Sequence, residues 1–340
     1  MTGSNASNSG VAVIGAGVVG LTTAIELAGW RERVTVFFDP VSVAPASWAA
    51  PALFTPYPGP DEARFKRWSE RSLSRLERIA AEHGAASGVH IGELREYFYK
   101  RPTSRPWLDE LVRNRPIRPL PGECLEATTS VRPHIDMLRY MPWLRSRAER
   151  LGVRFVERRV RSIDELVAEG WKKIVDCAGV GARELARDAL VKPMHGQVVH
   201  VPNDIGLQYS LHDDAQKPGN QGKVAYIFVF RDRLVLGGTF DAGREDARSD
   251  AAAVEGIVDR CRELLRIDGH AGWDKLARGE REVRVGVRPT RGGDGAFEWT
   301  RVEREQVGGA VVVHNYGHGR SGASFSWATA GEAAELAGRD

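Results

Sequence analysis

The sequence predicts an α/β protein in which a Rossmann-type parallel-sheet domain is interleaved with a mostly antiparallel β-sheet domain. Three observations predict this class. Apolar strands run into glycine turns near both ends of the chain, at residues 11–20 and 311–322. Short β-rich segments between residues 196 and 240 are typical of antiparallel pairing. Because α/β proteins bind ligands where such strands end, both ends of the sequence are expected to form one ligand site.

The opening glycines match a dinucleotide-binding turn. Gly15 permits a tight turn after the first strand, Gly17 lets the backbone approach a pyrophosphate, and Gly20 allows close helix packing. Apolar residues at helical spacing follow, and Gly29 is placed to end that helix. The N–H groups that begin such a helix are available to phosphate oxygens.

A second strand over residues 34–38 delivers Asp39 about 20 residues after the glycines, where a carboxylate accepts hydrogen bonds from a ribose hydroxyl. The same carboxylate would repel a 2′-phosphate. The alternative is a purely structural strand-to-helix turn. Strand, helix and acid together favour dinucleotide binding.

The middle of the chain departs from a repeating βαβ order. Residues 47–57 are small and broken by prolines, which predicts a loop returning towards the ligand. Helices are expected over residues 64–83 and 135–151, and further parallel strands over 153–156 and 173–179.

The antiparallel domain is expected to contain strands over residues 197–201, 225–230 and 233–238, the last two joined by a tight polar turn. Residues 213–223 form a polar, glycine-bearing segment, which predicts a surface loop able to cover a site.

Composition excludes several classes of protein. The chain has 340 residues, 42% of them hydrophobic, and its net charge of +3 is small beside 48 basic and 45 acidic residues. Acids interleave the basic cluster at residues 145–161, so we expect a solvated helix face rather than a nucleic-acid patch. No apolar run approaches the roughly 20 residues that span a bilayer. Residues 1–9 lack signal-peptide features, which predicts a short flexible tail and a cytoplasmic protein.

Neither a disulfide framework nor a metal site is expected. Cys124, Cys177 and Cys261 are few and widely spaced. His314 and His318 are four residues apart, but the glycines around them leave no helix to place both on one face.

A series of motifs resembles the D-amino acid oxidase family over nearly the whole chain. The resemblance implies non-covalently bound FAD and oxidation of a D-amino acid to its imino acid, with hydride passing from substrate Cα to flavin N5. O2 would accept the electrons as hydrogen peroxide, and a homodimer is a family expectation. The motifs are, in order, residues 13–21 (VIGAGVVGL), 49–57 (AAPALFTPY), 176–180 (DCAGV), 195–197 (HGQ), Tyr226 before 236–238 (LGG), 286–291 (GVRPTR) and 314–319 (HNYGHG).

The resemblance also implies a division into domains. Residues 1–46, 130–195 and 285–340 would form the FAD-binding domain, and 47–129 and 196–284 the substrate-binding domain. A helix starting near residue 321 would point its positive end at a flavin carbonyl and favour the reduced, anionic flavin. The implied cofactor contacts are Gly15, Ala16, Gly17, Val18, Val19, Gly20, Asp39, Ala49, Ala50, Val160, Gly179, Gly317, His318, Gly319, Ser321, Gly322 and Ser324.

Arg291, Tyr226 and Arg320 are expected to contact the substrate. Arg291 corresponds to the second arginine of the family block and would bind the carboxylate bidentately, with Arg288 as the structural member. Tyr226 would share the carboxylate, although a half-buried strand aromatic is the alternative.

Arg320 replaces a small residue whose backbone carbonyl meets the substrate amine, and its side chain either favours an acidic substrate or points to solvent. Thr55 replaces a longer polar residue, and the lid tyrosine is missing between Ser210 and Tyr226, in a loop ending at Gly222. Two other functions stay open. One is a glycine, sarcosine or specialised-metabolite amine oxidase, and the other is an NAD-dependent dehydrogenase or a nucleotide-binding protein without catalysis.

Overall fold

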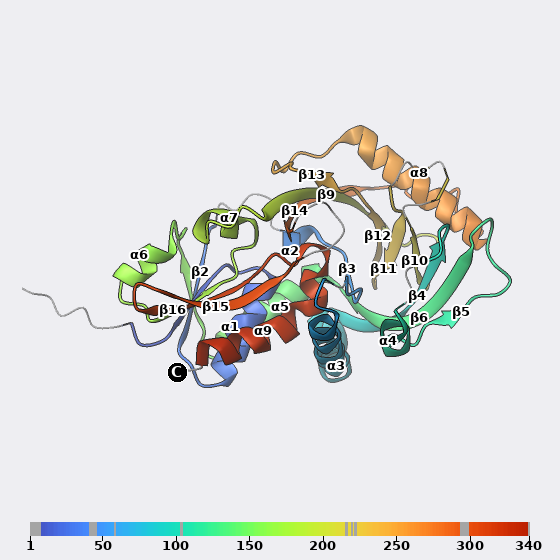
Figure 1. The fold of residues 1–340 in the computed structure, drawn as a ribbon. Coiled ribbons are helices and arrows are strands. Elements are labelled where there is room, and N and C mark those ends of the chain that lie inside the picture. The colour runs from blue at the N-terminus through green and yellow to red at the C-terminus, as the bar shows by residue number, and fades with distance from the viewer. Residues whose placement is uncertain are drawn as a thin grey trace, which may run out of the picture.

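Two β-sheets and their covering helices make up the computed structural model (Figure 1). One six-stranded sheet is covered by helices from both ends of the chain, and a larger sheet carries one long helix on its outer side. The structure describes residues 8–40, 46–57, 59–102, 105–214, 217–218, 220, 223–292 and 299–338.

The smaller sheet has the order β15-β16-β8-β1-β2-β7 and is parallel except for the β15–β16 hairpin. Its central strands are short and apolar because helices cover both faces. The strand order reverses beside β1, where β8 joins on the side opposite β2, so a ligand crevice is expected at their carboxyl ends. The strands are β1 (Val11–Ile14), β2 (Val34–Phe38), β7 (Arg154–Glu157), β8 (Lys173–Asp176), β15 (Arg301–Val307) and β16 (Ala310–Tyr316).

Helices from distant parts of the chain cover one face of this sheet. α1 (Val18–Gly29) contacts both α9 (Gly322–Gly338) and α5 (Met137–Arg150), and α3 (Glu62–Ser87) packs on α9. α9 is alanine-rich and almost wholly buried, so its neighbours approach it closely. The N-termini of α1 and α9 therefore lie at the same edge of the sheet.

The opposite face carries a smaller apolar cluster. α6 (Ile163–Ala168) contributes Leu166 to it, and the ring centres of Phe37 and Trp171 lie 5.6 Å apart in an edge-to-face arrangement. Two further short helices are α2 (Ala46–Ala49) and α7 (Ala182–Leu185).

The larger sheet has the order β13-β9-β12-β11-β10-β4-β6-β3, with β14 paired to β9 and β5 to β6. Every pair in it is antiparallel except β10 with β4. Helix α8 (Ala251–Asp268) packs on it through apolar residues at helical spacing, and α4 (Pro106–Leu111) lies at its far end. The strands are β3 (Ala52–Leu53), β4 (Val89–Phe98), β5 (Arg115–Pro116), β6 (Glu126–Ile135), β9 (Val191–Pro202), β10 (Ser210–Asp213), β11 (Tyr226–Val229), β12 (Arg233–Gly237), β13 (Asp241–Ala242) and β14 (Glu282–Arg291).

The predicted fold class is confirmed, because a parallel sheet and a mostly antiparallel sheet are interleaved along the chain. One predicted helix begins too early: Ile135 ends β6, and α5 starts at Met137 behind the N-cap Asp136. The predicted domain boundaries at 130 and 285 fall inside β6 and β14. Both strands belong to the larger sheet, where β6 pairs with β4 and β14 pairs with β9. We propose boundaries after Ile135 and Arg291 instead.

None of the described helices is long and apolar enough to cross a membrane. The described residues contain no group of three or more His, Cys, Asp or Glu side chains placed to hold a metal ion. Cys124, Cys177 and Cys261 are buried free thiols.

The segment predicted as a polar surface loop, residues 213–223, begins with a buried carboxyl group. Asp213 is 0% exposed and accepts a hydrogen bond of 2.7 Å from the Ala225 N–H. Burial raises the pKa of Asp213 to about 7. Positions 215, 216, 219, 221 and 222 of this segment, Gly222 among them, lie outside the described residues.

The raised pKa of Asp213 predicts a pH-dependent stability. Between about pH 4 and pH 7 the unfolded chain has lost this proton and the folded protein has kept it, so the free energy of unfolding falls as pH rises and then levels off. Asp213→Asn, which keeps an acceptor for Ala225, should remove this slope and stabilise the protein at pH 8 by on the order of 3 kcal/mol. Urea unfolding at pH 5 and pH 8 measures the effect. The exposed Asp204→Asn is the control, and an unchanged slope in Asp213→Asn would contradict the prediction.

Candidate functional site

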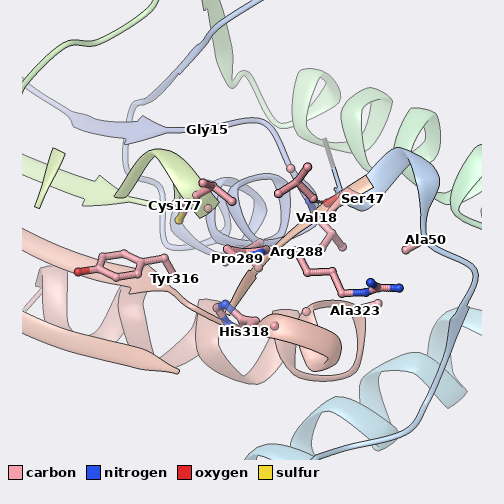
Figure 2. A pocket seen from close by; sticks show the side chains of 18 of the residues that line it. Gly15, Val18, Ser47, Ala50, Cys177, Arg288, Pro289, Tyr316, His318 and Ala323 are labelled. Atoms are coloured by element: carbon pink, nitrogen blue, oxygen red, sulfur yellow. Dashed lines mark hydrogen bonds between the residues drawn. The ribbon is translucent and has the colours of Figure 1, made fainter. Parts of the chain in front are cut away.

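A cavity of about 940 Å³ lies between the two sheets (Figure 2). The carboxyl ends of β1, β2, β8 and β16 form one part of its wall, and residues of β4, β11 and β14 form the other. It therefore combines the crevice expected at the switch point of the parallel sheet with a surface of the antiparallel sheet.

The turn after β1 is shaped to bring backbone N–H groups to the cavity. Gly15 has φ +105°, and a Cβ there would lie 2.5 Å from the carbonyl oxygen of Cys177. A Cβ on Gly20 would lie 1.9 Å from the carbonyl oxygen of Gly15, so α1 packs directly on the turn. No side chain caps α1 at Gly17, and the Val18 N–H donates to Ser47 Oγ at 3.0 Å. This helix start suits a phosphate group.

Asp39 follows β2 and lines the same cavity. Its carboxylate lies 3.8 Å from Nε of Arg159, and Val160 lines the wall beside it. A carboxylate beyond the second strand of a parallel sheet accepts hydrogen bonds from ribose hydroxyls. This end of the cavity is thus suited to a nucleoside.

The chain between β16 and α9 forms another wall. Gly317 has φ +79°, and a Cβ there would lie 2.7 Å from Cβ of Arg291. The start of α9 holds the loop around residues 50–57: Ser321 Oγ accepts from the Tyr57 N–H at 3.0 Å, and Ser324 Oγ accepts from the Thr55 N–H at 3.1 Å. Backbone and a helix N-terminus therefore face the cavity here.

His318 lies in this wall but is not suited to bind a metal. Its Nε2 lies 3.1 Å from Thr329 Oγ1, and burial lowers the pKa of His318 to about 3. The imidazole is therefore neutral and held in the protein interior. His314 instead pairs with Glu305, whose Oε1 lies 2.9 Å from His314 Nε2.

The larger sheet supplies the polar groups at the other end. The Tyr226 ring packs where any Cβ on Gly237 would clash, and burial raises the pKa of Tyr226 to about 12. Arg288 extends from β14 into the cavity, with its Nη1 3.2 Å from the carbonyl oxygen of Thr239 (Figure 2). Arg320 lies at the cavity with Cζ 3.9 Å from the ring centre of Tyr57. Two guanidinium groups and a phenol therefore gather at this end.

Comparison with known proteins agrees with this geometry. The family model described as FAD dependent oxidoreductase (DAO) matches residues 10–336. The chain belongs to this family. A D-amino-acid oxidase from Rubrobacter xylanophilus is 36% identical over 96% of this chain and 95% of its own. A D-aspartate oxidase from Homo sapiens is 30% identical over 96% and 94%. The solved glycine oxidase from Geobacillus kaustophilus is 20% identical, with a TM-score of 0.72 over 96% of this chain and 94% of its own.

The residues present fit the family's FAD. Three features lie along one cavity and match the parts of FAD. The start of α1 at Gly17, which no side chain caps, suits a pyrophosphate, and the Asp39 carboxylate suits a ribose. The glycine wall at Gly317 suits a flat ring system. The protein is therefore an FAD-dependent oxidoreductase of the amino acid oxidase family.

Most of the predicted site residues line the cavity. Four do not. Gly20 supports the turn from behind, Ala49 packs against Gly286, Ser321 binds the Tyr57 N–H, and Arg291 lies outside. Those that line it are Gly15, Ala16, Gly17, Val18, Val19, Asp39, Ala50, Val160, Gly179, Tyr226, Gly317, His318, Gly319, Arg320, Gly322 and Ser324.

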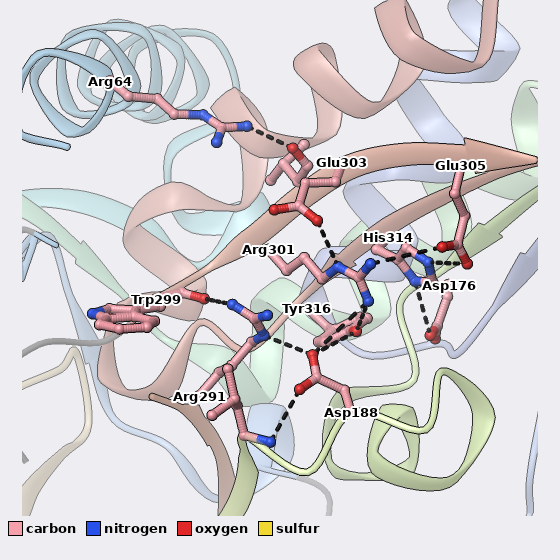
Figure 3. A network of polar contacts seen from close by, with 12 residues as sticks. Arg64, Asp176, Asp188, Arg291, Trp299, Arg301, Glu303, Glu305, His314 and Tyr316 are labelled. Carbon is pink, nitrogen blue, oxygen red and sulfur yellow. Dashed lines mark hydrogen bonds and ion pairs between the residues drawn. The ribbon is translucent and has the colours of Figure 1, made fainter. Parts of the chain in front are cut away.

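The expectation that Arg291 clamps the substrate requires correction. Its Nε donates to Asp188 Oδ2 at 2.7 Å, and its Nη1 donates to the Trp299 carbonyl oxygen at 3.1 Å (Figure 3). Tyr316 donates to the same Asp188 oxygen at 2.9 Å. Residues three apart on a strand face opposite sides, so only one of Arg288 and Arg291 can face the cavity. That residue is Arg288.

The partners of Asp188 determine its ionisation. Burial alone would raise the pKa of Asp188, but hydrogen bonds from Arg291 and Tyr316 outweigh it and hold the pKa below its usual value. The pair therefore contributes stability above about pH 4 that is lost as pH falls through the lower, folded-state pKa.

Arg291→Gln should lower the free energy of unfolding by about 3 kcal/mol, because it leaves the buried Asp188 carboxylate without its main counter-charge. Urea unfolding at pH 7 measures this. The exposed Arg67→Gln on α3 serves as a control that should change little. A variant as stable as the parent protein would show that the pair is unimportant.

Sequence reasoning missed several lining residues. Ser47 Oγ accepts a hydrogen bond from the Val18 N–H, and His212, Phe240 and Glu96 line the end of the cavity near Tyr226. Only Arg288 carried a usable signal, because recognising residues 282–291 as one strand separates the two arginines by face. Glu96 and His212 come from β4 and β10, strands whose pairing the sequence does not reveal, while Ser47 lies in α2 and Phe240 between β12 and β13.

Proposed function

We propose that this protein oxidises D-amino acids to imino acids, with Arg288 and Tyr226 binding the substrate carboxylate. The observation that carries the proposal is the position of Arg288 inside the cavity, at the end that Tyr226 also lines. Guanidinium binds a carboxylate bidentately, and a phenol adds one more donor.

The place of the amine follows from this clamp. With the carboxylate on Arg288, the rest of the substrate extends towards the wall at residues 317–320, where the backbone carbonyl of Arg320 is proposed to accept from the amine. Fixing both groups holds the substrate Cα in one position, and a small displacement of a reacting carbon costs rate steeply.

FAD, when bound, supplies the acceptor for the hydride of the Cα–H bond. The substrate loses two electrons and two protons overall and becomes an imino acid, which water hydrolyses to an oxo acid and ammonia. O2 takes up the two electrons and two protons and becomes hydrogen peroxide. The start of α9 beside Gly322 adds a positive dipole that stabilises negative charge in this wall.

A panel of substrates tests the proposal. The purified yellow protein should release peroxide and ammonia in equal amounts from one or more D-amino acids, and not from their L-enantiomers. Turnover of glycine or sarcosine alone would instead establish the second candidate, a glycine-type amine oxidase. The fold that this chain shares with glycine oxidase supports this candidate. Yellow protein inactive on every D-amino acid would refute the proposal. O2 as acceptor, the cytoplasmic location and a homodimer stay predictions.

A further inference from the structure

We infer that the preferred substrates are dicarboxylic D-amino acids, with Arg288 binding the α-carboxylate and Arg320 the side-chain carboxylate. This inference rests on the proposed function and names the substrate class of the same site. It is carried by the charged and aromatic residues at one end of the cavity.

Two guanidinium groups lie around one aromatic ring there. Cζ of Arg288 is 4.7 Å from the ring centre of Phe240, and Cζ of Arg320 is 5.9 Å from the same centre. Arg288 lies in β14 of the larger sheet, and Arg320 lies in the turn between β16 and α9. Both residues line the cavity. A single small molecule at this end can therefore meet both cations.

Aromatic contacts hold Arg320 at the cavity. Its Cζ lies 3.9 Å from the ring centre of Tyr57, a distance at which the ring face attracts a guanidinium. The Tyr57 backbone is itself fixed to Ser321 through its N–H, at 3.0 Å. Arg320 is exposed, but the Tyr57 ring that it contacts also lines the cavity.

The acidic residue at this end is already neutralised. Glu96 lines the cavity, but its Oε2 lies 2.5 Å from Nη2 of Arg132, a side chain that is 5% exposed. Burial lowers the pKa of His212, which lines the wall beside Glu96, so its imidazole is neutral near pH 7. Arg288 and Arg320 bring positive charge to this end of the cavity.

This charge balance discriminates between substrates. A neutral D-amino acid satisfies one arginine through its α-carboxylate. D-Aspartate and D-glutamate carry a second carboxylate that can accept charge-assisted hydrogen bonds from the other. Because Arg320 is exposed, the expected effect lies at the low end for such a bond, about 10-fold.

Steady-state kinetics of the holoenzyme with D-aspartate, its neutral isostere D-asparagine and D-alanine tests the inference. The parent enzyme should favour D-aspartate over D-asparagine about 10-fold in kcat/KM. Arg320→Gln should abolish this preference, because it should raise KM for D-aspartate about 10-fold more than KM for D-asparagine. Arg320→Lys should keep part of it, since the charge remains.

Binding of non-reacting acids provides a second measurement. Succinate should perturb the flavin spectrum of the holoenzyme at a concentration about 10-fold lower than butyrate does, and Arg320→Gln should remove that difference. Flavin content and thermal unfolding confirm that the variant is folded, and the exposed Arg67→Gln on α3 is the matched control.

The outcomes separate the inference from the proposed function. Oxidation of neutral D-amino acids with no preference for the acid, or an equal loss for both in Arg320→Gln, overturns the inference alone. A folded, yellow enzyme that oxidises no D-amino acid overturns both.

Discussion

Arg288→Gln should lower kcat/KM for D-amino acids by on the order of 100-fold or more, because removing one partner of a buried charge pair costs about 2–5 kcal/mol. The guanidinium is half-buried, packs over Gly196 and lines the cavity. A neutral amide cannot replace the bidentate contact proposed for it. Most of the loss should appear in KM, since both ground state and transition state carry the carboxylate. Initial-rate measurements of peroxide release give both constants.

Arg291→Gln is the matched comparison for this variant, since the two arginines lie three residues apart on β14. It should retain kcat/KM per bound flavin while losing stability. Arg288→Lys should recover part of the lost activity, because an ammonium keeps the charge but not the planar fork. If Arg291→Gln lost activity and Arg288→Gln kept it, the assignment made from the cavity would be reversed.

Gly20→Ala should destabilise the protein by about 3 kcal/mol and reduce its flavin content, because the added Cβ would lie 1.9 Å from the Gly15 carbonyl oxygen. Backbone atoms form the clash, so relief requires α1 to move away from the turn that meets the pyrophosphate. Urea unfolding and the ratio of flavin to protein absorbance after gel filtration measure the two effects.

Gly29→Ala provides the control within the same helix. No atom lies within 4 Å of a Cβ built at Gly29, so this substitution adds a methyl group in open space and should leave flavin content unchanged. Equal behaviour of the two variants would show that close packing at the turn is not what holds the cofactor site together.

The parallel half of the fold is predictable because its signals are local. The strand, turn and helix at residues 11–29 specify one another through apolar spacing and glycines, and Asp39 follows at a fixed distance. The antiparallel half is less predictable, because its strands pair with distant parts of the chain. β4 pairs with β10 and β6, across more than a hundred residues in the first case, and nothing in its own pattern identifies those partners.

The candidate site shows the same division. Most of the residues expected to contact the cofactor line the cavity, whereas Ala49 packs against Gly286 behind it. The substrate-binding arginine could not be chosen from the sequence, because the choice between Arg288 and Arg291 depends on the face of β14 and on Asp188, which lies 103 residues before its partner. Side-chain direction and distant counter-charges are tertiary properties.

Anaerobic mixing of the purified yellow protein with the two enantiomers of one amino acid tests the central claim most directly. The D-enantiomer should bleach the visible absorbance of the flavin within the turnover time, and readmitted O2 should restore it with one peroxide per substrate. The L-enantiomer should leave the spectrum unreduced. Bleaching by the L-enantiomer alone, or by neither over a full panel of amino acids, would contradict the proposal that this protein oxidises D-amino acids.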